Sequence, residues 1–541
     1  MKRNSLILSL FLISNITLSN IAFAQTTDAQ EVTLQQIIPA PVEFRADGGF
    51  NRTEGGFLKA DASKTKADGS RTGRVQVKLG RRAFRKEVAQ LQPWQQQEAY
   101  RLTIGRKKIR IEALTKEGVF RARTTLEQLQ AQGPLPCCTI LDYPRFRHRG
   151  LMIDESRSFK GLPFLKKQAD AMALLKLNVL HLHLDDSAGW RIESESRPEL
   201  TAKTAFRKGW DYFAWEAGKY QFATEADGDG GYYTQAELRE LVEYCAQRYI
   251  TVIPEIEMPG HSMEVGYAFP AVWCTQADGT PFHGSWDLCP GSEETFSLLE
   301  DVLTEVMDLF PGPYIHIGGD EATMKTWPLC VKCRQRMQEE GFTEVKQLQG
   351  YLMRRVEAFV RTHGRRVIGW DEILETGVPE NAVVQSWRGI EGGVKGSNAG
   401  HDVVLSPSTH CYLNYYQDLI RKEPKATGEL VSLRFCYGYE PITKEMVPEH
   451  ILGLQGNLWC EYIPTPEHAE YMLYPRLFAI AETAWTPSAN KDWADFRRRA
   501  HALASVFRTR GYRTFDLDTE SELAGSGFQR FEQLEEAKLR K

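Results

Sequence analysis

The sequence predicts an α/β protein, a (β/α)₈ TIM barrel that is preceded by a small α+β domain. Eight short apolar runs follow one another between residues 147 and 487, and amphipathic helical stretches separate several of them. A strand-rich segment with shorter spacing precedes them. Alternating strands and helices imply a parallel sheet. Eight such units favour a barrel, whose usual length is ~250 residues with insertions allowed.

The chain begins with a stretch that is typical of a secretory signal. Residues 1–24 contain a basic start, an apolar run and the pair Ala22 and Ala24 around one residue, which predicts cleavage after Ala24. A membrane anchor is the weaker alternative, because Ser14 and Asn15 interrupt the run and a spanning helix needs ~20 apolar residues. We therefore expect a secreted or periplasmic protein with no membrane span.

Residues 25–140 are expected to form the small N-terminal domain. Its predicted strands and helix have periods of two and 3.6 residues, respectively. The strands are 75–80, 99–105 and 108–114, and the helix is 117–132. The segment "GPLPCC", residues 133–138, contains two prolines and a glycine and is expected to separate this domain from the rest.

Residues 141–490 are expected to form the barrel, and the polar, helical segment 491–541 a C-terminal tail. Helices are predicted at 162–177 and 234–249. The eight expected strands are 150–154, 178–184, 251–257, 314–318, 366–370, 382–387, 402–406 and 451–459. A doubly wound open sheet is the alternative, and it is disfavoured because no Gly-rich phosphate loop follows the first strand.

Composition excludes little beyond nucleic-acid binding. Hydrophobic residues make up 42% and charged residues 26% of the 541 residues, as in ordinary globular proteins. The net charge of −4 gives no overall field that would favour nucleic acid or an anionic membrane. The oligomeric state is left open.

Ten cysteines are too few for a disulfide scaffold in a chain of this size. Cys274 and Cys289 bracket a Gly-containing loop, and we expect a disulfide between them. Cys330-x-x-Cys333 has the spacing of a zinc half-site, but no second such pair follows nearby, so a local disulfide or free thiols are favoured. The sequence thus predicts neither a metal nor a cofactor.

The stretch "HIGGDEA", residues 316–322, places two acids side by side after an apolar strand. Neighbouring side chains of a strand point to opposite faces, so Asp320 and Glu321 can share a pocket only after the chain has left the strand. Gly318 and Gly319 permit that exit. Taken alone, the pair is also consistent with a helix cap followed by an acid in the first turn.

The barrel prediction places functional side chains just past the carboxyl ends of the strands. These positions hold acids, one arginine, one histidine and several tryptophans. They are Asp154, Arg157, Asp185, Asp186, Glu257, His261, Asp320, Glu321, Trp370, Asp371, Trp387, Tyr412, Trp459 and Glu461. Such a set suits a sugar ring, whose apolar faces stack on aromatics while its hydroxyls need fixed donors and acceptors.

Seven motifs together resemble one known family. In chain order they are "RGLMIDESRSF", "KLNVLHLHLDD", "PEIEMPGH", "HIGGDEA", "GWDE", "QSWRG" and "LWCEY". Their order is similar to that in the β-N-acetylhexosaminidases of glycoside hydrolase family 20, and the resemblance covers nearly the whole mature chain. It implies an exo-acting, retaining hydrolase that releases terminal β-linked N-acetylglucosamine or N-acetylgalactosamine from a glycan.

The resemblance also assigns the two adjacent acids. It implies substrate-assisted catalysis, in which the sugar's own 2-acetamido oxygen attacks C1 and forms an oxazolinium intermediate. Glu321 would be the general acid and then the base. Asp320 would orient and polarise the acetamido group and would not attack.

Further roles follow from the resemblance, residue by residue. Arg157 and Glu461 would bind the sugar hydroxyls, and Tyr412 would donate to the acetamido oxygen. Asp185 and His261 would form a relay beside Glu321. The walls of the sugar pocket would be Trp370, Trp387 and Trp459. Asn414 stands where an Asp is common among bacterial members and would face the O4/O6 edge.

Three alternatives remain. A glycan-binding protein without activity would keep the tryptophans and lose the acid, yet Asp320 and Glu321 are both present. A disaccharide-releasing relative would need a more open pocket. A metal-dependent hydrolase is disfavoured, because no His/Asp cluster in the sequence has ligand spacing.

Overall fold

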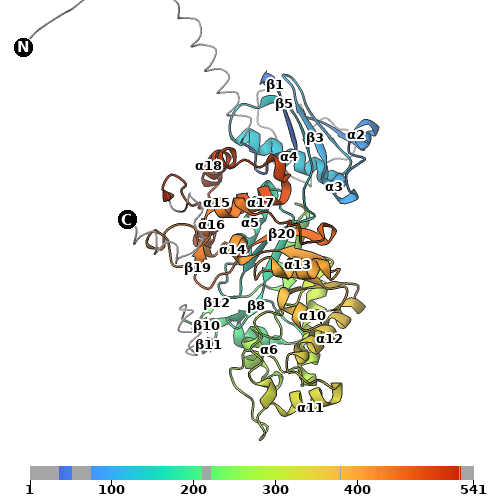
Figure 1. Ribbon diagram of the computed structural model, residues 1–541. Helices are drawn as coiled ribbons and strands as arrows, with labels where there is room; N and C mark the ends of the chain where they lie inside the picture. Colours follow the sequence, from blue (N-terminus) through green and yellow to red (C-terminus); the bar gives the residue numbers. More distant parts are fainter. Residues whose placement is uncertain (1–35, 52–74, 210–220, 378, 523, 525–541) are drawn as a thin grey trace, which may run out of the picture.

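The computed structural model describes residues 36–51, 75–209, 221–377, 379–522 and 524 (Figure 1). The small domain lies at one end of the molecule and the barrel at the other. The predicted signal sequence, residues 1–24, lies outside the described residues. Among the described residues, no helix is both long and apolar enough to cross a membrane.

The small domain is a five-stranded sheet with a helix on one face. In spatial order its strands are β1 (Glu43–Phe50), β5 (Pro136–Asp142), β3 (Tyr100–Ile104), β4 (Ile109–Ala113) and β2 (Val75–Leu79). Its helices are α2 (Arg82–Glu87), α3 (Pro93–Glu98) and α4 (Lys116–Ala131). The predicted strands 75–80, 99–105 and 108–114 and the helix 117–132 are confirmed, and the Thr115 side chain caps α4 by accepting from the N–H of Gly118.

One part of the small-domain prediction is wrong. The segment "GPLPCC" does not end the domain, because its last residues begin β5, which pairs with both β1 and β3. Pro136 is tolerated there because it is the first residue of the strand. The strand continues to Asp142, two residues past the predicted boundary at 140.

Eight parallel strands close into a barrel, as the sequence predicts. They are β6 (His148–Asp154), β7 (Val179–His183), β13 (Thr251–Glu255), β14 (Tyr314–His316), β15 (Arg366–Trp370), β16 (Val383–Ser386), β17 (Val403–Leu405) and β20 (Ile451–Leu458). Each coincides with one of the eight apolar runs, and β20 pairs with β6 to complete the ring. These strands are apolar because helices cover their outer face and side chains fill the interior.

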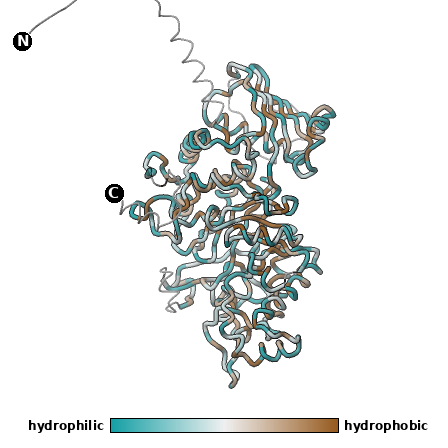
Figure 2. The backbone as a smooth tube through the Cα atoms, viewed as in Figure 1, coloured by the Kyte–Doolittle hydropathy of each residue, from teal (hydrophilic) through white to brown (hydrophobic). Residues whose placement is uncertain are grey.

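Helices surround the barrel. The main ones are α5 (Leu162–Leu174), α8 (Gln235–Ala246), α10 (Glu293–Leu309), α12 (Gln347–Thr362), α13 (Glu391–Asn398) and α17 (Arg476–Trp485). The predicted helices 162–177 and 234–249 correspond to α5 and α8. Thr234 and Glu237 form a capping box at the start of α8. The hydrophobic colour of Figure 2 concentrates along the barrel strands and the helices packed on them.

The remaining elements lie in the connections and, for the 17-residue α18 (Trp493–Thr509), in the predicted C-terminal segment. The helices are α6 (Pro198–Thr204), α9 (Met263–Ala268), α11 (Val331–Glu340), α14 (Ser408–Cys411), α15 (Leu433–Gly438), α16 (Pro466–Leu473) and α18 (Trp493–Thr509). The strands are β8 (Asp185–Asp186), β9 (Gly189–Trp190), β10 (Phe206–Lys208), β11 (Gln221–Ala223), β12 (Asp229–Gly230), β18 (Tyr415–Tyr416) and β19 (Thr427–Leu430). The 3₁₀ helices are η3 (Pro270–Val272), η4 (Trp327–Leu329), η5 (Asp371–Glu375), η6 (Ile420–Lys422), η7 (Pro448–His450) and η8 (Ser488–Asn490).

The barrel interior changes from apolar to polar along its axis. A packed layer closes the amino end, formed by Val179, Ile253, Ile368, Val383, Val404 and Leu452. Two residues further along their strands, His181, Glu255 and Trp370 occupy the next inward positions, because inward side chains recur every second residue. This polar layer supports the open carboxyl end, where the predicted site lies.

A buried ion pair connects the small domain to the barrel. The ammonium group of Lys176, which follows α5, lies 2.7 Å from the carboxylate of Asp142 at the end of β5, and both side chains are inaccessible to solvent. Asp142 also accepts hydrogen bonds from the Tyr100 hydroxyl and the Trp485 indole. Asp142 and Tyr100 belong to the small domain, and Lys176 and Trp485 belong to the barrel. Each of these buried polar groups therefore has a partner at the junction.

Candidate active site

The two adjacent acids leave β14 through a turn that only glycine can make. Gly318 and Gly319 have φ angles of +59° and +104°. A Cβ atom at 318 would lie 1.8 Å from the Glu257 carboxylate, and one at 319 would lie 2.7 Å from Ile373. Both the backbone conformation and the lack of space thus require glycine.

The turn gives the two acids different surroundings. Asp320 is 8% exposed, and one of its carboxylate oxygens has no hydrogen-bond partner among the described residues. Glu321 has a φ of +46°, and its side chain is 58% exposed. Burial raises the pKa of Asp320, whereas a hydrogen bond from His261 lowers the pKa of Glu321. The acids are adjacent in sequence but chemically distinct.

His261 joins both acids to a third carboxylate. Its Nε2 lies 3.4 Å from Glu321 and 3.6 Å from Asp320, and its Nδ1 lies 3.0 Å from Asp186. The prediction that Asp185 forms this relay is wrong. The Asp185 carboxylate instead accepts from the backbone N–H of Glu257. Successive strand residues point to opposite sides, so only one of the two aspartates can face His261.

Charge pairing holds this relay ionised. Burial alone would lower the pKa of His261, but the Asp186 carboxylate raises it to about 10. Burial likewise opposes ionisation of Asp186, yet Arg157 and His261 hold the pKa of that carboxyl far below its usual range. The relay is therefore an imidazolium between carboxylates at neutral pH.

The relay predicts a pH-dependent contribution to stability. Because the folded pKa of His261 is above its unfolded value of ~6.5, its contribution is complete below that pH and is lost as pH rises through about 10. We expect the Tm difference between the wild type and His261→Gln to be largest near pH 6 and to shrink by pH 10.5. Calorimetry checks this. His363→Gln, at an exposed position, is the control, and a difference that does not change with pH would contradict the pairing.

The predicted aromatic residues do come together. Trp370, Trp459 and Tyr412 form one cluster with Met152, and Trp387 packs against it. The rings of Trp387 and Tyr412 are stacked at 6.1 Å, and those of Trp370 and Trp459 lie 5.8 Å apart. These contacts form a continuous wall at the barrel mouth.

Hydrogen bonds fix the orientation of the wall. The Trp370 indole donates to Glu255 in the barrel interior, and the Trp387 indole donates to Glu372. Burial, with Asp320 and Glu372 nearby, raises the pKa of Tyr412 well above its usual value, so its hydroxyl remains a proton donor. The wall therefore presents ring faces and one hydroxyl beside Asp320.

Arg157 lies between the relay and the aromatic wall. Its guanidinium group is 2.6 Å from Asp186 and 5.0 Å from the ring centre of Trp459. Burial raises the pKa of Glu461 while the charge of Arg157 opposes that shift, which places the two residues near each other. Asn414 is buried, and its amide donates to Thr427, so the described contacts tie it to β19.

Three further acids support the site, of which only Glu257 was predicted, as a strand-end residue. Glu255 interacts with three buried histidines, His181, His183 and His316. Glu257 accepts from the N–H of Gly319 and so holds the turn before the acids. Glu372, whose pKa burial raises to about 8, holds Trp387. Its position just past the end of β15 is the signal that could have identified Glu372.

Family models match both domains of the chain. The model described as "Glycosyl hydrolase family 20, catalytic domain" matches residues 146–488. The model described as "Glycosyl hydrolase family 20, domain 2" matches residues 34–143. Together they span the small domain and the barrel.

Known proteins are similar over most of the chain. A β-hexosaminidase of Porphyromonas gingivalis is 39% identical over 427 residues, which cover 74% of this chain but 52% of the relative. One of Vibrio furnissii is 38% identical and covers 73% and 66%, respectively. The chain thus spans about half to two thirds of these relatives. The structure of an exo-β-N-acetylglucosaminidase of Vibrio harveyi with N-acetylglucosamine superimposes with a TM-score of 0.74 at 29% identity, over 89% of this chain and 78% of that one.

Proposed function

Because the chain belongs to glycoside hydrolase family 20, we propose that it is an exo-acting, retaining β-N-acetylhexosaminidase that works by substrate-assisted catalysis. Its substrate would be a glycan with a terminal β-linked N-acetylglucosamine or N-acetylgalactosamine. The observation that carries the proposal is the pair of adjacent acids with unlike surroundings, Asp320 buried beside the aromatic wall and Glu321 exposed beside His261.

In the first step, the sugar's acetamido group is the nucleophile. Its carbonyl oxygen forms a bond to C1 while the bond from C1 to the leaving oxygen breaks, and Glu321 gives its proton to that oxygen. The ring closes to an oxazolinium ion. Asp320 accepts from the acetamido N–H and stabilises the positive charge that develops there, and Tyr412 donates to the acetamido oxygen.

In the second step, water reopens the intermediate. Glu321, now a carboxylate, takes a proton from the water, whose oxygen forms a bond to C1 as the acetamido oxygen departs. Two inversions at C1 give overall retention. The intramolecular nucleophile contributes an effective molarity of roughly 10⁵ M or more.

The relay accounts for the protonation state of Glu321. Without substrate, the His261 hydrogen bond favours the carboxylate form. A bound glycoside would cover the exposed Glu321 side chain, and loss of water raises the pKa of a carboxyl group. The His261 imidazolium is then the adjacent proton donor. Asp186 pairs with the imidazolium before the transfer, and Arg157 still pairs with Asp186 once the imidazole is neutral.

Arg157 and Glu461 support exo action. Both lie next to Trp459 or its neighbours at one side of the aromatic wall, where they would bind the hydroxyls of the non-reducing sugar. A planar guanidinium suits two vicinal hydroxyls. We infer that these charged groups close that side of the pocket to a second sugar. The predicted signal sequence supports a secreted or periplasmic location.

A panel of aryl glycosides tests the function. The purified chain is given aryl β-N-acetylglucosaminide, β-N-acetylgalactosaminide and β-glucoside, and chromophore release is measured. We expect cleavage of the first two. The rate on the β-glucoside should be at least ~10³-fold lower, because its C2 hydroxyl cannot act as the nucleophile. Equal rates on all three would refute substrate assistance.

The same preparation tests exo action on a chito-oligosaccharide. The expected first product is the monosaccharide, with each longer oligomer shortened by one unit at a time. Mass spectrometry through the early time course identifies the first product. A disaccharide would indicate a pocket that is open beyond the first sugar.

A further inference from the structure

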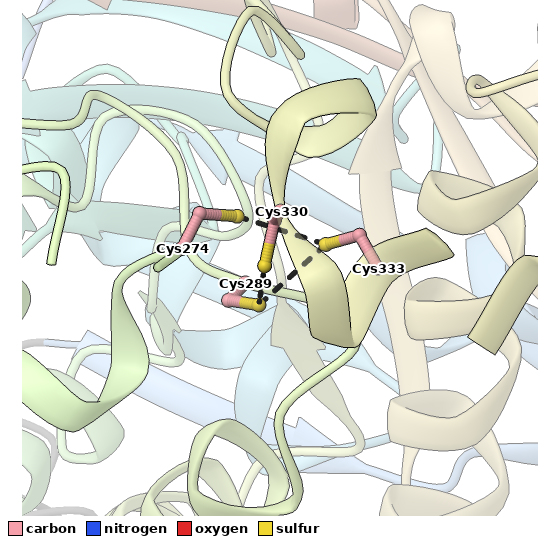
Figure 3. A group of neighbouring side chains, drawn as sticks. All are labelled: Cys274, Cys289, Cys330 and Cys333. Carbon is pink, nitrogen blue, oxygen red and sulfur yellow. Dashed lines mark hydrogen bonds between the residues drawn. The ribbon is translucent and has the colours of Figure 1, made fainter. Parts of the chain in front are cut away.

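Four cysteines from distant parts of the sequence converge at one point (Figure 3). Cys274 follows η3, and Cys289 lies in the loop before α10. Cys330 and Cys333 lie at the start of α11. All four are buried, and their sulfur atoms lie within 4.8 Å of one another.

The distances between the sulfurs match the edges of a metal-centred tetrahedron. Cys274 and Cys333 are 3.6 Å apart, Cys289 and Cys330 3.7 Å, and Cys289 and Cys333 3.5 Å. A tetrahedral Zn²⁺ with Zn–S bonds of ~2.3 Å separates its ligands by about 3.8 Å. A disulfide would require about 2.05 Å, and neither the predicted bond between Cys274 and Cys289 nor any other is formed.

The surroundings suit thiolates bound to a cation. Cys330 is the N-cap residue of α11, so its sulfur lies at the amino end of that helix. Helix N-termini favour negative charge, which suits a thiolate there. The shell beyond the sulfurs is apolar, with Trp327 and Leu348 buried against them. Such a shell keeps water away from the site.

The segments that carry the cysteines pack closely on one another. A Cβ atom at Gly291 would lie 2.4 Å from the backbone nitrogen of Cys333, so the loop after Cys289 lies directly on α11. Thr275 and Pro281 form an isolated antiparallel bridge that folds the chain back after Cys274. These contacts bring the loop segments to α11 at the point where the sulfurs meet.

We propose that Cys274, Cys289, Cys330 and Cys333 bind one structural Zn²⁺ ion. The site is closed, with four protein sulfurs and no position for substrate, so its role is to hold loops together. The two pairs of cysteines in this site differ in spacing. Cys330-x-x-Cys333 has the spacing of a zinc half-site, whereas Cys274 and Cys289 lie upstream, fifteen residues apart in the sequence and in different loops. A four-cysteine site is therefore not evident from the sequence.

The loops that the ion would join carry parts of the active site. Cys289 closely follows Trp286, whose ring packs on His261 at 4.6 Å, and Asp287. Asp287 accepts hydrogen bonds from Thr323 and from the N–H of Met324, just past the catalytic pair. Cys330 lies at the end of the segment that begins with Asp320 and Glu321. Zinc would thus fix the loop that carries Glu321, which no helix or strand holds in the described chain.

Metal content tests the proposal directly and without substrate. The full chain is purified without chelator, and zinc and iron are measured by inductively coupled plasma mass spectrometry. We expect about one zinc and no stoichiometric iron per chain. Replacement by Co²⁺ should give the thiolate-to-cobalt charge-transfer bands of a tetrahedral site. A thiol-specific mercurial should release the zinc into a colorimetric indicator.

A cysteine variant with a matched control locates the ion. Cys333→Ser is expected to reduce the zinc content by about tenfold or more and to lower Tm. Cys245→Ala, at a buried cysteine of α8 away from the cluster, should keep its zinc. Cobalt and mercurial measurements on the wild type still decide the question if Cys333→Ser does not fold.

Three outcomes would overturn the assignment. Mass spectrometry of the unreduced, alkylated protein that finds two disulfides among the four cysteines excludes the ion. Stoichiometric iron in place of zinc makes the metal assignment wrong. Zinc that stays in Cys333→Ser places the ion elsewhere. None of these depends on glycosidase activity, so failure of the zinc site is distinguishable from failure of the proposed reaction.

Discussion

Replacing Glu321 with glutamine is expected to reduce kcat/KM on chito-oligosaccharides by ~10²-fold or more, because an amide cannot give a proton to the leaving oxygen. Aryl glycosides with acidic leaving groups need little protonation and should lose much less in the first step. The measurement is a series of aryl N-acetylglucosaminides of graded leaving-group pKa. The variant's rate should fall steeply as that pKa rises.

Glu375→Gln is the matched control for this experiment. Glu375 also lies at the barrel mouth. Its side chain is 56% exposed and forms an ion pair with the guanidinium group of Arg388. It should keep wild-type rates across the series. A loss in Glu321→Gln that is equal for all leaving groups, with thermal stability unchanged, would show that Glu321 is not the acid.

Asp320→Asn is expected to reduce kcat by ~10²–10³-fold on every N-acetylhexosaminide, whatever its leaving group. The carboxylate stabilises the positive charge on the acetamido nitrogen, and a neutral amide does this less well. The loss should therefore be flat across the aryl series on which Glu321→Gln gives a slope. The shape of the two series, more than the size of either loss, separates the roles of the adjacent acids.

Asp402→Asn is the control, since Asp402 pairs with Arg366 at the opposite end of the barrel. Its rates should equal those of the wild type. A thiazoline analogue of the intermediate should inhibit the wild type strongly and Asp320→Asn weakly. A glycosyl ester trapped on Asp320 or Glu321 and detected by mass spectrometry would restore an ordinary two-carboxylate mechanism.

The barrel was predictable because its strands are buried on both faces. After their first residue, runs such as "NVLHLHL" and "TVIPEIE" are buried throughout, and their carboxylates stand near the carboxyl end or just beyond it. The same rule predicted Trp370, which ends β15, and Asp320, Glu321 and His261, which lie in the loops just past β14 and β13. β5 was missed because "GPLPCC" has the composition of a turn, and only pairing with β1 and β3 makes its end a strand.

The remaining details depend on contacts that no local pattern encodes. Asp185 and Asp186 are indistinguishable in sequence, and the register of a two-residue strand decides which one faces His261. A disulfide between Cys274 and Cys289 was predicted because their spacing gives no indication that Cys330 and Cys333 lie beside them. In both cases the deciding partner lies tens of residues away.

The Lys176–Asp142 contact has a consequence for how the molecule unfolds. If the small domain opened alone, Lys176 would remain as an uncompensated cation beside Trp485, and breaking a buried pair in this way costs about 3–5 kcal/mol. The Trp485 indole would lose its acceptor at the same time, because Asp142 belongs to the small domain. Partial opening is thus penalised on both sides of the junction. The small domain and the barrel then behave as one cooperative unit, and heat should melt them in a single transition.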